Sequence, residues 1–257
     1  MVDQRSMTIS GTASKLMITL SRDKVSIHLA AMAGGSNTHP EIAYSLASHF
    51  SHDEIVKALD QALSDHPFLL ESFTSVKLVF IDQPGITLPL QYIQEGRLED
   101  IASRHLRLRA GDYLTYDISA GNTAFSYTIP KNSLAAIREY YASLSYCHLS
   151  SLLWNAISDQ VYQDNVHSYY LVFDNCLTVL STKHGRIQFF RQFHVRNASD
   201  VLYYCIATNR LLRPLQRYAV VVQDTQRAFE IAEHATFIIN GYIHLPDLPS
   251  LVARYQP

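Results

Sequence analysis

The residues best placed for chemistry are Asp174 and Asn175, which lie in a turn between two expected strands. Backbone N–H groups at a turn between two strands can form a concave site that binds phosphate. Such a turn needs glycine, because backbone N–H groups must approach the phosphate oxygens closely. The segment 174–177 reads Asp-Asn-Cys-Leu and contains no glycine. The turn therefore has the position of a phosphate site without the residue type that would complete it.

A second acidic turn lies near the N-terminus, where Arg22 and Asp23 separate two expected strands. This turn also lacks glycine. We therefore take Asp23, Asp174 and Asn175 as candidates for a degenerate nucleotide cleft, and we expect no cofactor, no bound metal and no catalytic residue. The doublet Gly34-Gly35 follows a strand, but no Lys-Ser or Lys-Thr comes after it as in a P-loop, which favours a connecting loop.

Acidic residues at strand ends indicate a different chemistry. Metal-dependent nucleases gather carboxylates at strand ends to hold two metal ions about 4 Å apart. Asp also favours turns for its own local hydrogen bonds, which is the simpler interpretation. The net charge of −2 gives no excess of cationic side chains for nucleic-acid phosphates, so we expect no nucleic-acid partner. The acids in question are Asp82, Asp117, Asp174 and Asp224.

Other candidate sites are weaker. His49 and His52 have a spacing that can bind metal on a helix, but they straddle an expected helix start and no third ligand is evident. A surface or capping role is the favoured interpretation. The sequence has neither a Gly-x-Ser-x-Gly elbow nor a Cys-x-x-Cys pair.

The elements that position these residues alternate between strands and helices. Apolar and alternating runs predict strands, and spacings of three and four predict helices. Ser51 and Glu54 form a capping box at the start of the first helix. The expected strands are 16–21, 25–32, 76–82, 86–92, 113–118 and 123–129, and the expected helices start near 51, 98, 134 and 149.

The C-terminal part begins with a three-stranded meander at 169–173, 176–181 and 186–195. A helix follows over 199–212, capped by Ser199 and Asp200, and it is apolar on several sides, so we expect it to be largely buried. A strand at 218–223, a helix at 226–233 and a strand at 236–239 complete the chain. A meander followed by helix, strand, helix and strand is the order of a ribonuclease-H-like module.

The N-terminal part has a looser version of the same order. Two such modules in tandem make an actin-like fold. We therefore expect an α/β protein with mixed sheets and two ribonuclease-H-like halves, at residues 1–165 and 166–257.

The chain also resembles a bacterial family, the domain of unknown function 3822, found mainly in Bacteroidetes. The resemblance covers most of the chain and rests above all on the sequence Asn-Ala-Ser-Asp-Val-Leu-Tyr-Tyr at 197–204. That family is similar to actin-like ATPases and to the cytoplasmic actin-like scaffolds of pilus and secretion machines. The resemblance implies a fold, and it brings no catalytic residue.

Composition limits the class of protein. The chain has 257 residues, of which 47% are hydrophobic and 17% charged, which is enough material for a core. No apolar run reaches the roughly 20 residues of a membrane helix, so we expect no membrane. Cys147, Cys176 and Cys205 are odd in number and set among apolar residues, which indicates buried reduced thiols and a cytoplasmic location.

Three functions are consistent with these observations. The leading one is a non-catalytic actin-like scaffold or protein-interaction module with a degenerate nucleotide cleft. The second is a divergent nucleotide-binding protein or ATPase that uses the cleft between the halves. The third is a metal-dependent ribonuclease-H-like nuclease. The expected partner is a protein, and the sequence indicates neither its identity nor an oligomeric state.

Overall fold

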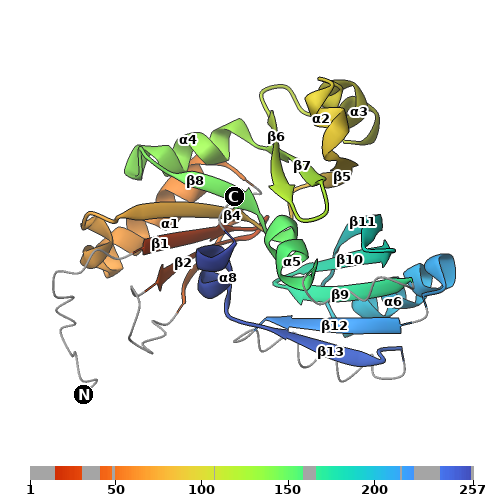
Figure 1. Ribbon diagram of the computed structural model, residues 1–257. Coiled ribbons are helices and arrows are strands. Elements are labelled where there is room, and N and C mark those ends of the chain that lie inside the picture. The colour runs from red at the N-terminus through yellow and green to blue at the C-terminus, as the bar shows by residue number, and fades with distance from the viewer. Residues whose placement is uncertain are drawn as a thin grey trace, which may run out of the picture. The chain divides into compact units, whose positions relative to one another are not determined.

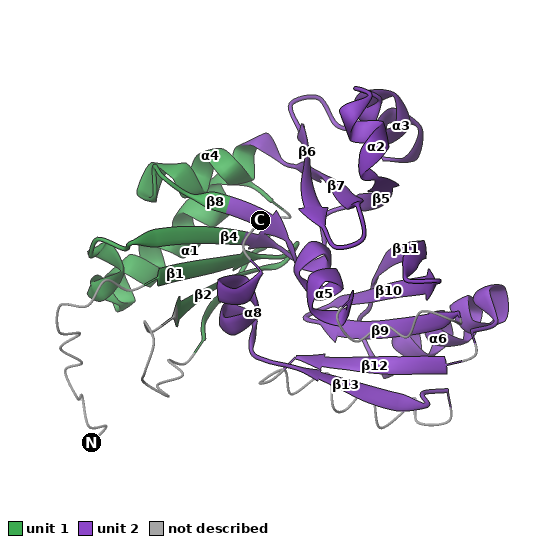
Figure 2. Ribbon diagram, viewed as in Figure 1, with its two compact units in different colours: residues 1–78, 132–145 green, residues 79–131, 146–257 purple. Residues whose placement is uncertain are grey.

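The computed structural model describes residues 15–30, 41–47, 50–106, 108–158, 166–214, 216–222 and 238–255. Strands and helices alternate along this part of the chain (Figure 1). The chain divides into two compact units (Figure 2). Unit 1 comprises Met1–Leu78 and Asn132–Ser145, and unit 2 comprises Val79–Lys131 and Tyr146–Pro257. The expected boundary at residue 165 stays a prediction.

The first five-stranded sheet has the order β3-β2-β1-β4-β8. Its first two strands form the predicted N-terminal hairpin, because β1 and β2 pair antiparallel from Lys15 with Ala30 to Leu20 with Val25. The sequence analysis gives no signal for β3 or β8, which are only four residues each. The strands are β1 Lys15–Leu20, β2 Lys24–Ala30, β3 Ile42–Ser45, β4 Ser75–Phe80 and β8 Ser145–His148.

Three helical segments accompany this sheet: α1 (His52–Asp65), the 3-10 turn η1 (Pro67–Leu70) and α4 (Lys131–Tyr140). Ile55, Leu59 and Ala62 of α1 are buried, as their spacing predicts. The predicted capping box is wrong. Ser51 is the N-cap but makes no side-chain cap hydrogen bond, while Glu54 accepts from the backbone N–H of Ala47. The Glu54 carboxylate thus binds the backbone of the segment that precedes α1 instead of the N-cap residue.

Unit 2 contains a three-stranded antiparallel sheet in the order β5-β7-β6. The β6–β7 hairpin has almost the predicted bounds. The expected strand at 86–92 is wrong after Pro89, because α2 begins at Leu90, whose N–H donates to Asn122 O at 2.8 Å. The elements are β5 Gly85–Pro89, α2 Leu90–Gln94, α3 Leu98–His105, β6 Tyr113–Ser119 and β7 Thr123–Ile129.

A second five-stranded sheet, also in unit 2, has the order β11-β10-β9-β12-β13. The predicted meander is confirmed, since β9, β10 and β11 pair antiparallel in sequence, and β12 pairs parallel with β9 and β13. The expected helix 226–233 lies outside the described residues. The expected strand at 236–239 is misplaced, because Ile238 and Ile239 precede β13. The strands are β9 His167–Phe173, β10 Cys176–Lys183, β11 Arg186–His194, β12 Gln216–Val222 and β13 Gly241–Leu245.

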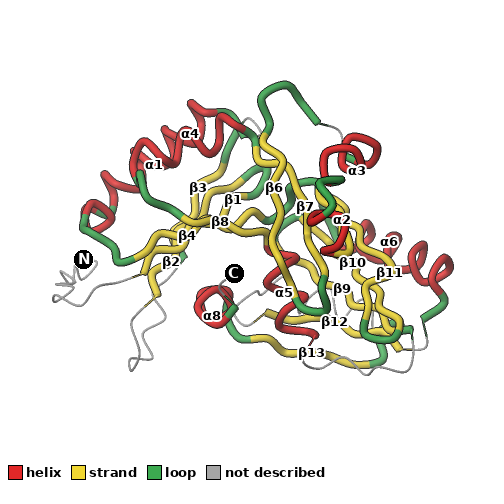
Figure 3. Tube along the Cα trace, turned by 45° about the horizontal axis from the view of Figure 1, so that its top comes forward, coloured by secondary structure: helices red, strands yellow, loops and turns green. Residues whose placement is uncertain are grey.

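One face of this second sheet is covered by α6 (Ala198–Leu212) (Figure 3). Val201, Cys205 and Thr208 of α6 are buried. The expectation that α6 is largely buried is wrong, because Tyr203 is 65% exposed and Leu211 71% exposed. A helix that covers an outer face of a sheet buries a single stripe, whatever the composition of its other sides.

Two further helices of unit 2 are α5 (Leu149–Ser158) and α8 (Leu248–Arg254). Eight of the ten residues of α5 are buried, which makes it the interior helix of the unit. Trp154 Nε1 donates to Ala120 O at 2.9 Å, and Asn155 Oδ1 accepts from Ala120 N at 2.8 Å. Helix α5 therefore holds the β6–β7 turn through both backbone polar groups of one residue, Ala120. The three cysteines are buried, as predicted.

The start of α6 is capped by Asn197 rather than by the predicted Ser199. The Asn197 Oδ1 accepts from Asp200 N at 3.0 Å, and Asp200 Oδ2 accepts in return from Arg196 N at 2.8 Å. Ser199 is exposed. The prediction that Asp200 takes part in the cap is confirmed, and Asn197 is the second capping residue.

We predict that Asn197→Ala lowers the free energy of unfolding by about 1 kcal/mol, because it leaves the Asp200 N–H without its acceptor. Ser199→Ala is the matched control and should change the free energy by less than about 0.5 kcal/mol. Urea unfolding followed by circular dichroism measures both. Equal losses in the two variants would contradict this assignment of the cap.

Candidate functional site

The β1–β2 turn, in unit 1, contains the candidate Asp23. The Ser21 Oγ donates to Asp23 Oδ1 at 3.1 Å and lies 3.3 Å from Lys24 O. The backbone carbonyl of Asp23 accepts from Leu46 N at 2.7 Å. Side-chain and backbone groups of the turn are thus used to fix its own shape and to attach it to the segment after β3.

The β9–β10 turn, in unit 2, contains the candidates Asp174 and Asn175. Asp174 has φ of +50°, in the left-handed region that favours glycine. The carbonyl of Asn175 accepts from Val195 N at 2.8 Å, so the turn is tied to the end of β11. Both residues carry side chains, whereas a phosphate-binding turn favours glycine. A role of Asp23, Asp174 and Asn175 in ligand binding stays a prediction.

The strand-end acids do not form a nuclease site in the part of the chain that the structure describes. Among these residues, no three His, Cys, Asp or Glu side chains are grouped so that they could hold a metal ion. Asp82 follows the end of β4, Asp117 lies within β6, and Asp174 lies in the β9–β10 turn. Asp224 lies outside the described residues.

Asp117 is instead the centre of a buried polar cluster in unit 2. Its side chain is 6% exposed. Oδ2 accepts from the backbone N–H of His148 at 2.7 Å and from Ser151 Oγ at 2.7 Å, and Oδ1 accepts from the Tyr127 hydroxyl at 3.1 Å. Burial, and then the charge of Asp117, raises the pKa of Tyr127, so the phenol stays a donor. A carboxylate at the first turn of α5 is also favoured by the helix dipole.

His148 completes the cluster in one defined tautomer. Its Nδ1 accepts from the backbone N–H of Ser150 at 3.0 Å, so the proton resides on Nε2, which donates to Gln83 O at 3.1 Å. The imidazole is 1% exposed. Burial lowers the pKa of His148 to about 4, while the bond to Gln83 O acts in the opposite direction. The ring is therefore neutral near pH 7 and caps α5.

Asp117, His148 and Ser151 have the residue types of a hydrolase triad but not its connections. A triad needs the serine hydroxyl hydrogen-bonded to the imidazole. Here the Ser151 hydroxyl contacts Asp117 Oδ2 and His148 O, each at 2.7 Å, and both imidazole nitrogens are used by backbone groups. All three residues are buried. The cluster positions α5 and contains no activated nucleophile.

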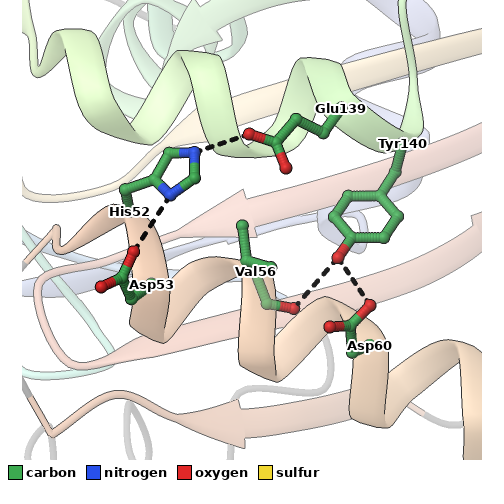
Figure 4. A network of polar contacts seen from close by, with 6 residues as sticks. All are labelled: His52, Asp53, Val56, Asp60, Glu139 and Tyr140. Atoms are coloured by element: carbon green, nitrogen blue, oxygen red, sulfur yellow. Dashed lines mark hydrogen bonds and ion pairs between the residues drawn. The ribbon is translucent and has the colours of Figure 1, made fainter.

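His52, one of the two expected metal-site histidines, lies on the surface of unit 1, and His49 lies outside the described residues. Figure 4 shows His52 between Glu139 of α4, at 2.7 Å from Nε2, and Asp53 of α1, at 3.3 Å from Nδ1. Beside it, the Tyr140 hydroxyl lies 2.6 Å from Asp60 Oδ1 and 3.4 Å from Val56 O. These contacts fasten α4 to α1. They give His52 the surface role favoured by the sequence.

The family of the chain follows from its match to a family model. Residues 3–216 match the model described as a protein of unknown function, DUF3822. The chain belongs to this family. The predicted resemblance is thereby confirmed. Strand β13 and α8 lie beyond the matched residues, although β13 completes the second sheet of unit 2.

Solved structures define the fold of this DUF3822 protein. A Bacteroides thetaiotaomicron protein with an actin-like ATPase fold and unknown function has a TM-score of 0.73 at 15% identity, covering 95% of this chain and 96% of that one. A chain of the PilM–PilN type IV pilus biogenesis complex has a TM-score of 0.55 at 10% identity, covering 94% and 92%. The comparison with curated proteins gives no match. The predicted α/β class and actin-like ATPase fold are confirmed.

Sequence reasoning missed the Asp117 cluster. It took Asp117 as a strand-end acid, whereas the structure places it inside β6 with its side chain inward. The available signal was alternation, since Asp117 and Ser119 share the buried face of β6 while Tyr116 and Ile118 are exposed. A charged residue on a buried face requires donors from elsewhere, and here they come from β7, the end of β8 and α5. None of the described helices is long and apolar enough to cross a membrane.

We predict that acid destabilises the protein through His148. The folded-state pKa of about 4 lies below the ordinary 6.5, so the unfolded state binds more protons between these values. The contribution of neutral His148 to the free energy of unfolding is fully present above pH 6.5. It decreases by about 3 kcal/mol as the pH falls to 4. In His148→Asn, which keeps an acceptor for the Ser150 N–H but does not titrate, this part of the pH dependence should vanish. Urea unfolding across this range measures it, and parallel profiles for the two proteins would contradict the assignment.

We predict the opposite sign for His52. Hydrogen bonds to Glu139 and then to Asp53 raise the pKa of His52 above 6.5. The α1–α4 attachment is therefore strongest below pH 6.5 and weakens as pH rises through the raised pKa. An NMR titration of the ring should show a midpoint above 6.5 that falls in Glu139→Gln, and falls less in Asp53→Asn. An unchanged midpoint in Glu139→Gln would exclude this contact in solution.

Proposed function

We propose that this protein is a non-catalytic actin-like scaffold that binds another protein and has lost the ability to use a nucleotide. The observation that carries the proposal is the chemistry of the β9–β10 turn. Asp174 adopts a left-handed conformation with a side chain present, and Asn175 follows it with a second one. Phosphate turns favour glycine, which leaves the backbone N–H groups accessible, and neither position is glycine here.

The β1–β2 turn supports the same proposal. Its hydroxyl and carboxylate, on Ser21 and Asp23, contact each other at 3.1 Å. The hydrogen bond from the Ser21 hydroxyl therefore orients the Asp23 carboxylate without any ligand. In our proposal Asp23, Asp174 and Asn175 are remnants of a nucleotide cleft, and the two ribonuclease-H-like halves divide near residue 165.

A structural neighbour supports a protein partner. The actin-like fold recurs in the PilM–PilN complex, which is a complex of two proteins in type IV pilus biogenesis. Fold similarity alone does not set function, so the support is by analogy. We further propose a cytoplasmic location, because all three cysteines are buried thiols. The net charge of −2 argues against a nucleic-acid partner.

We predict that the full chain, tagged and expressed in its native cell, co-purifies with a specific protein partner. The yield should be the same with and without Mg-ATP. The double variant Asp23→Asn and Asp174→Asn should retain the partner, because it removes two charges from the proposed remnant cleft while keeping side-chain volume. Quantitative mass spectrometry against an untagged control measures the recovery.

A thermal-shift measurement with Mg-ATP tests whether the protein binds nucleotide. A ligand present at 100 times its dissociation constant stabilises a fold by about 2.7 kcal/mol, which raises the melting temperature by several degrees. We expect no shift. A reproducible shift that is lost in the double variant would overturn the proposal in favour of a nucleotide-binding protein.

A further inference from the structure

A pocket of about 480 Å³ opens within unit 2, where the edges of its two sheets approach each other. Its walls are the end of β5 with the start of α2, the β6–β7 turn, and the start of β11. Among the described strands, β5 and β11 are edge strands of different sheets, and they lie side by side (Figure 1). The pocket is therefore bounded by two strand edges and a hairpin turn.

The turn that forms one wall is fixed by its neighbours. Gly121 and Asn122 have φ of +70° and +54°, the left-handed conformation of a tight hairpin turn. Asn122 O accepts from Leu90 N, which ties the turn to α2. A Cβ on Gly121 would lie 3.8 Å from the carbonyl oxygen of Gly185, so the β6–β7 turn also lies against the β10–β11 turn. The wall is held in place without a ligand.

The β11 wall contains a bulge. Ser181 pairs with Phe189 and Thr182 with Ile187, so Gln188 is an extra residue without a partner on β10. A bulge at a sheet edge turns its extra side chain away from the regular alternation. Gln188 is one of the pocket-lining residues. The irregularity of the strand thus coincides with the pocket.

The residues that line the pocket carry a positive charge and no negative charge. Arg186 is the only charged residue among them, and it makes no ion pair or side-chain hydrogen bond within the described part of the chain. The nearest acid along α2, Glu95, does not line the pocket. It accepts from Gln91 Nε2 at 2.8 Å and lies 3.8 Å from Arg97 Nη1. The pocket therefore offers a cation whose charge no lining residue balances.

The remaining lining residues are neutral. Six of them carry hydroxyl or amide groups that donate and accept hydrogen bonds: Thr87, Gln91, Gln94, Asn122, Thr123 and Gln188. Leu88, Leu90 and Ile187 add apolar surface. A volume of 480 Å³ lies in the range of organic ligands and exceeds the need of an inorganic anion.

We propose that this pocket binds an extended acidic segment of a partner protein, with Arg186 pairing with an Asp or Glu carboxylate. This inference rests on the proposed scaffold function. A guanidinium binds carboxylate through two parallel hydrogen bonds. The amide and hydroxyl groups match the alternating donors and acceptors of a peptide main chain, and the apolar residues accept a neighbouring apolar side chain. Phosphopeptide sites use clusters of arginines, whereas this pocket has one.

The test uses the full chain and a displayed library of short random peptides. We expect the selected peptides to share an Asp or Glu, and to bind the wild-type protein in fluorescence anisotropy. Arg186→Gln should weaken that binding about tenfold, because a charged hydrogen-bonded pair is lost. Arg186→Glu should abolish it.

Arg191→Gln is the matched control, because Arg191 is an exposed arginine of the same strand that does not line the pocket. It should bind the peptides as the wild type does. Arg186 and Arg191 are both exposed, and Arg186 makes no ion pair or side-chain hydrogen bond with the residues that the structure describes, so all three variants should keep the unfolding midpoint of the wild type. Equal weakening by Arg191→Gln would show a nonspecific charge effect and overturn the proposal.

Three other outcomes would also overturn it. They are a library that yields no binding peptide, selected peptides without a common acid, and selected peptides that bind Arg186→Gln as tightly as the wild type. Inorganic phosphate and citrate are tested in parallel by thermal shift. A shift that requires Arg186, in the absence of peptide binding, would assign a small-anion site instead.

The co-purification from native cells separates this proposal from the scaffold function. If the wild type and Arg186→Gln recover the same partner in equal amounts, the scaffold function stands and the pocket is not its binding site. If neither protein recovers a specific partner, the scaffold function itself fails. A partner lost only in Arg186→Gln and Arg186→Glu agrees with both.

Discussion

A buried carboxylate at the first turn of an interior helix organises unit 2. Asp117 receives hydrogen bonds from Tyr127 of β7 and from His148 and Ser151 at the start of α5. A carboxylate that is 6% exposed is tolerated only when its lone pairs are satisfied, so these donors must stay in place. The position of α5 relative to the three-stranded sheet is thereby restricted to the geometry that serves Asp117.

Other contacts extend this constraint through the unit. From α5, Trp154 and Asn155 hold Ala120 and with it the β6–β7 turn. Gln192 of β11 donates to Ile81 O at 2.9 Å, and Phe125 packs edge-on against Phe190 with ring centroids 5.3 Å apart. Both contacts attach the three-stranded sheet and its neighbouring segment to the edge of the second sheet. The proposed peptide pocket is lined by the β6–β7 turn, which α5 holds, and by the start of β11.

Residue types typical of an active site come together in this structure without the contacts that catalysis needs. Ser, His and Asp come together around Asp117, yet the hydroxyl binds the carboxylate, and the imidazole binds two backbone groups. Of the acids considered for a nuclease site, the three that the structure describes lie in different segments: Asp117 within β6, Asp82 after β4 and Asp174 in the β9–β10 turn. Within this actin-like fold, the polar residues around Asp117 and in the β1–β2 turn hold helices and turns in place. A function based on surface recognition is consistent with that use of polar groups.

What the sequence determined by itself was the local structure. The N-terminal hairpin, the β6–β7 hairpin and the β9–β11 meander follow from alternation and turn residues, which are properties of a few consecutive positions. The positions of Asp23, Asp174 and Asn175 in turns were predictable for the same reason. What only the tertiary structure decided depends on residues far apart in the chain. Asp117 meets His148 across 31 positions, α6 buries one stripe because a sheet covers only one side of it, and Leu90 starts a helix next to Asn122. Such contacts are selected by packing and by the need to satisfy buried polar groups, which no local pattern encodes.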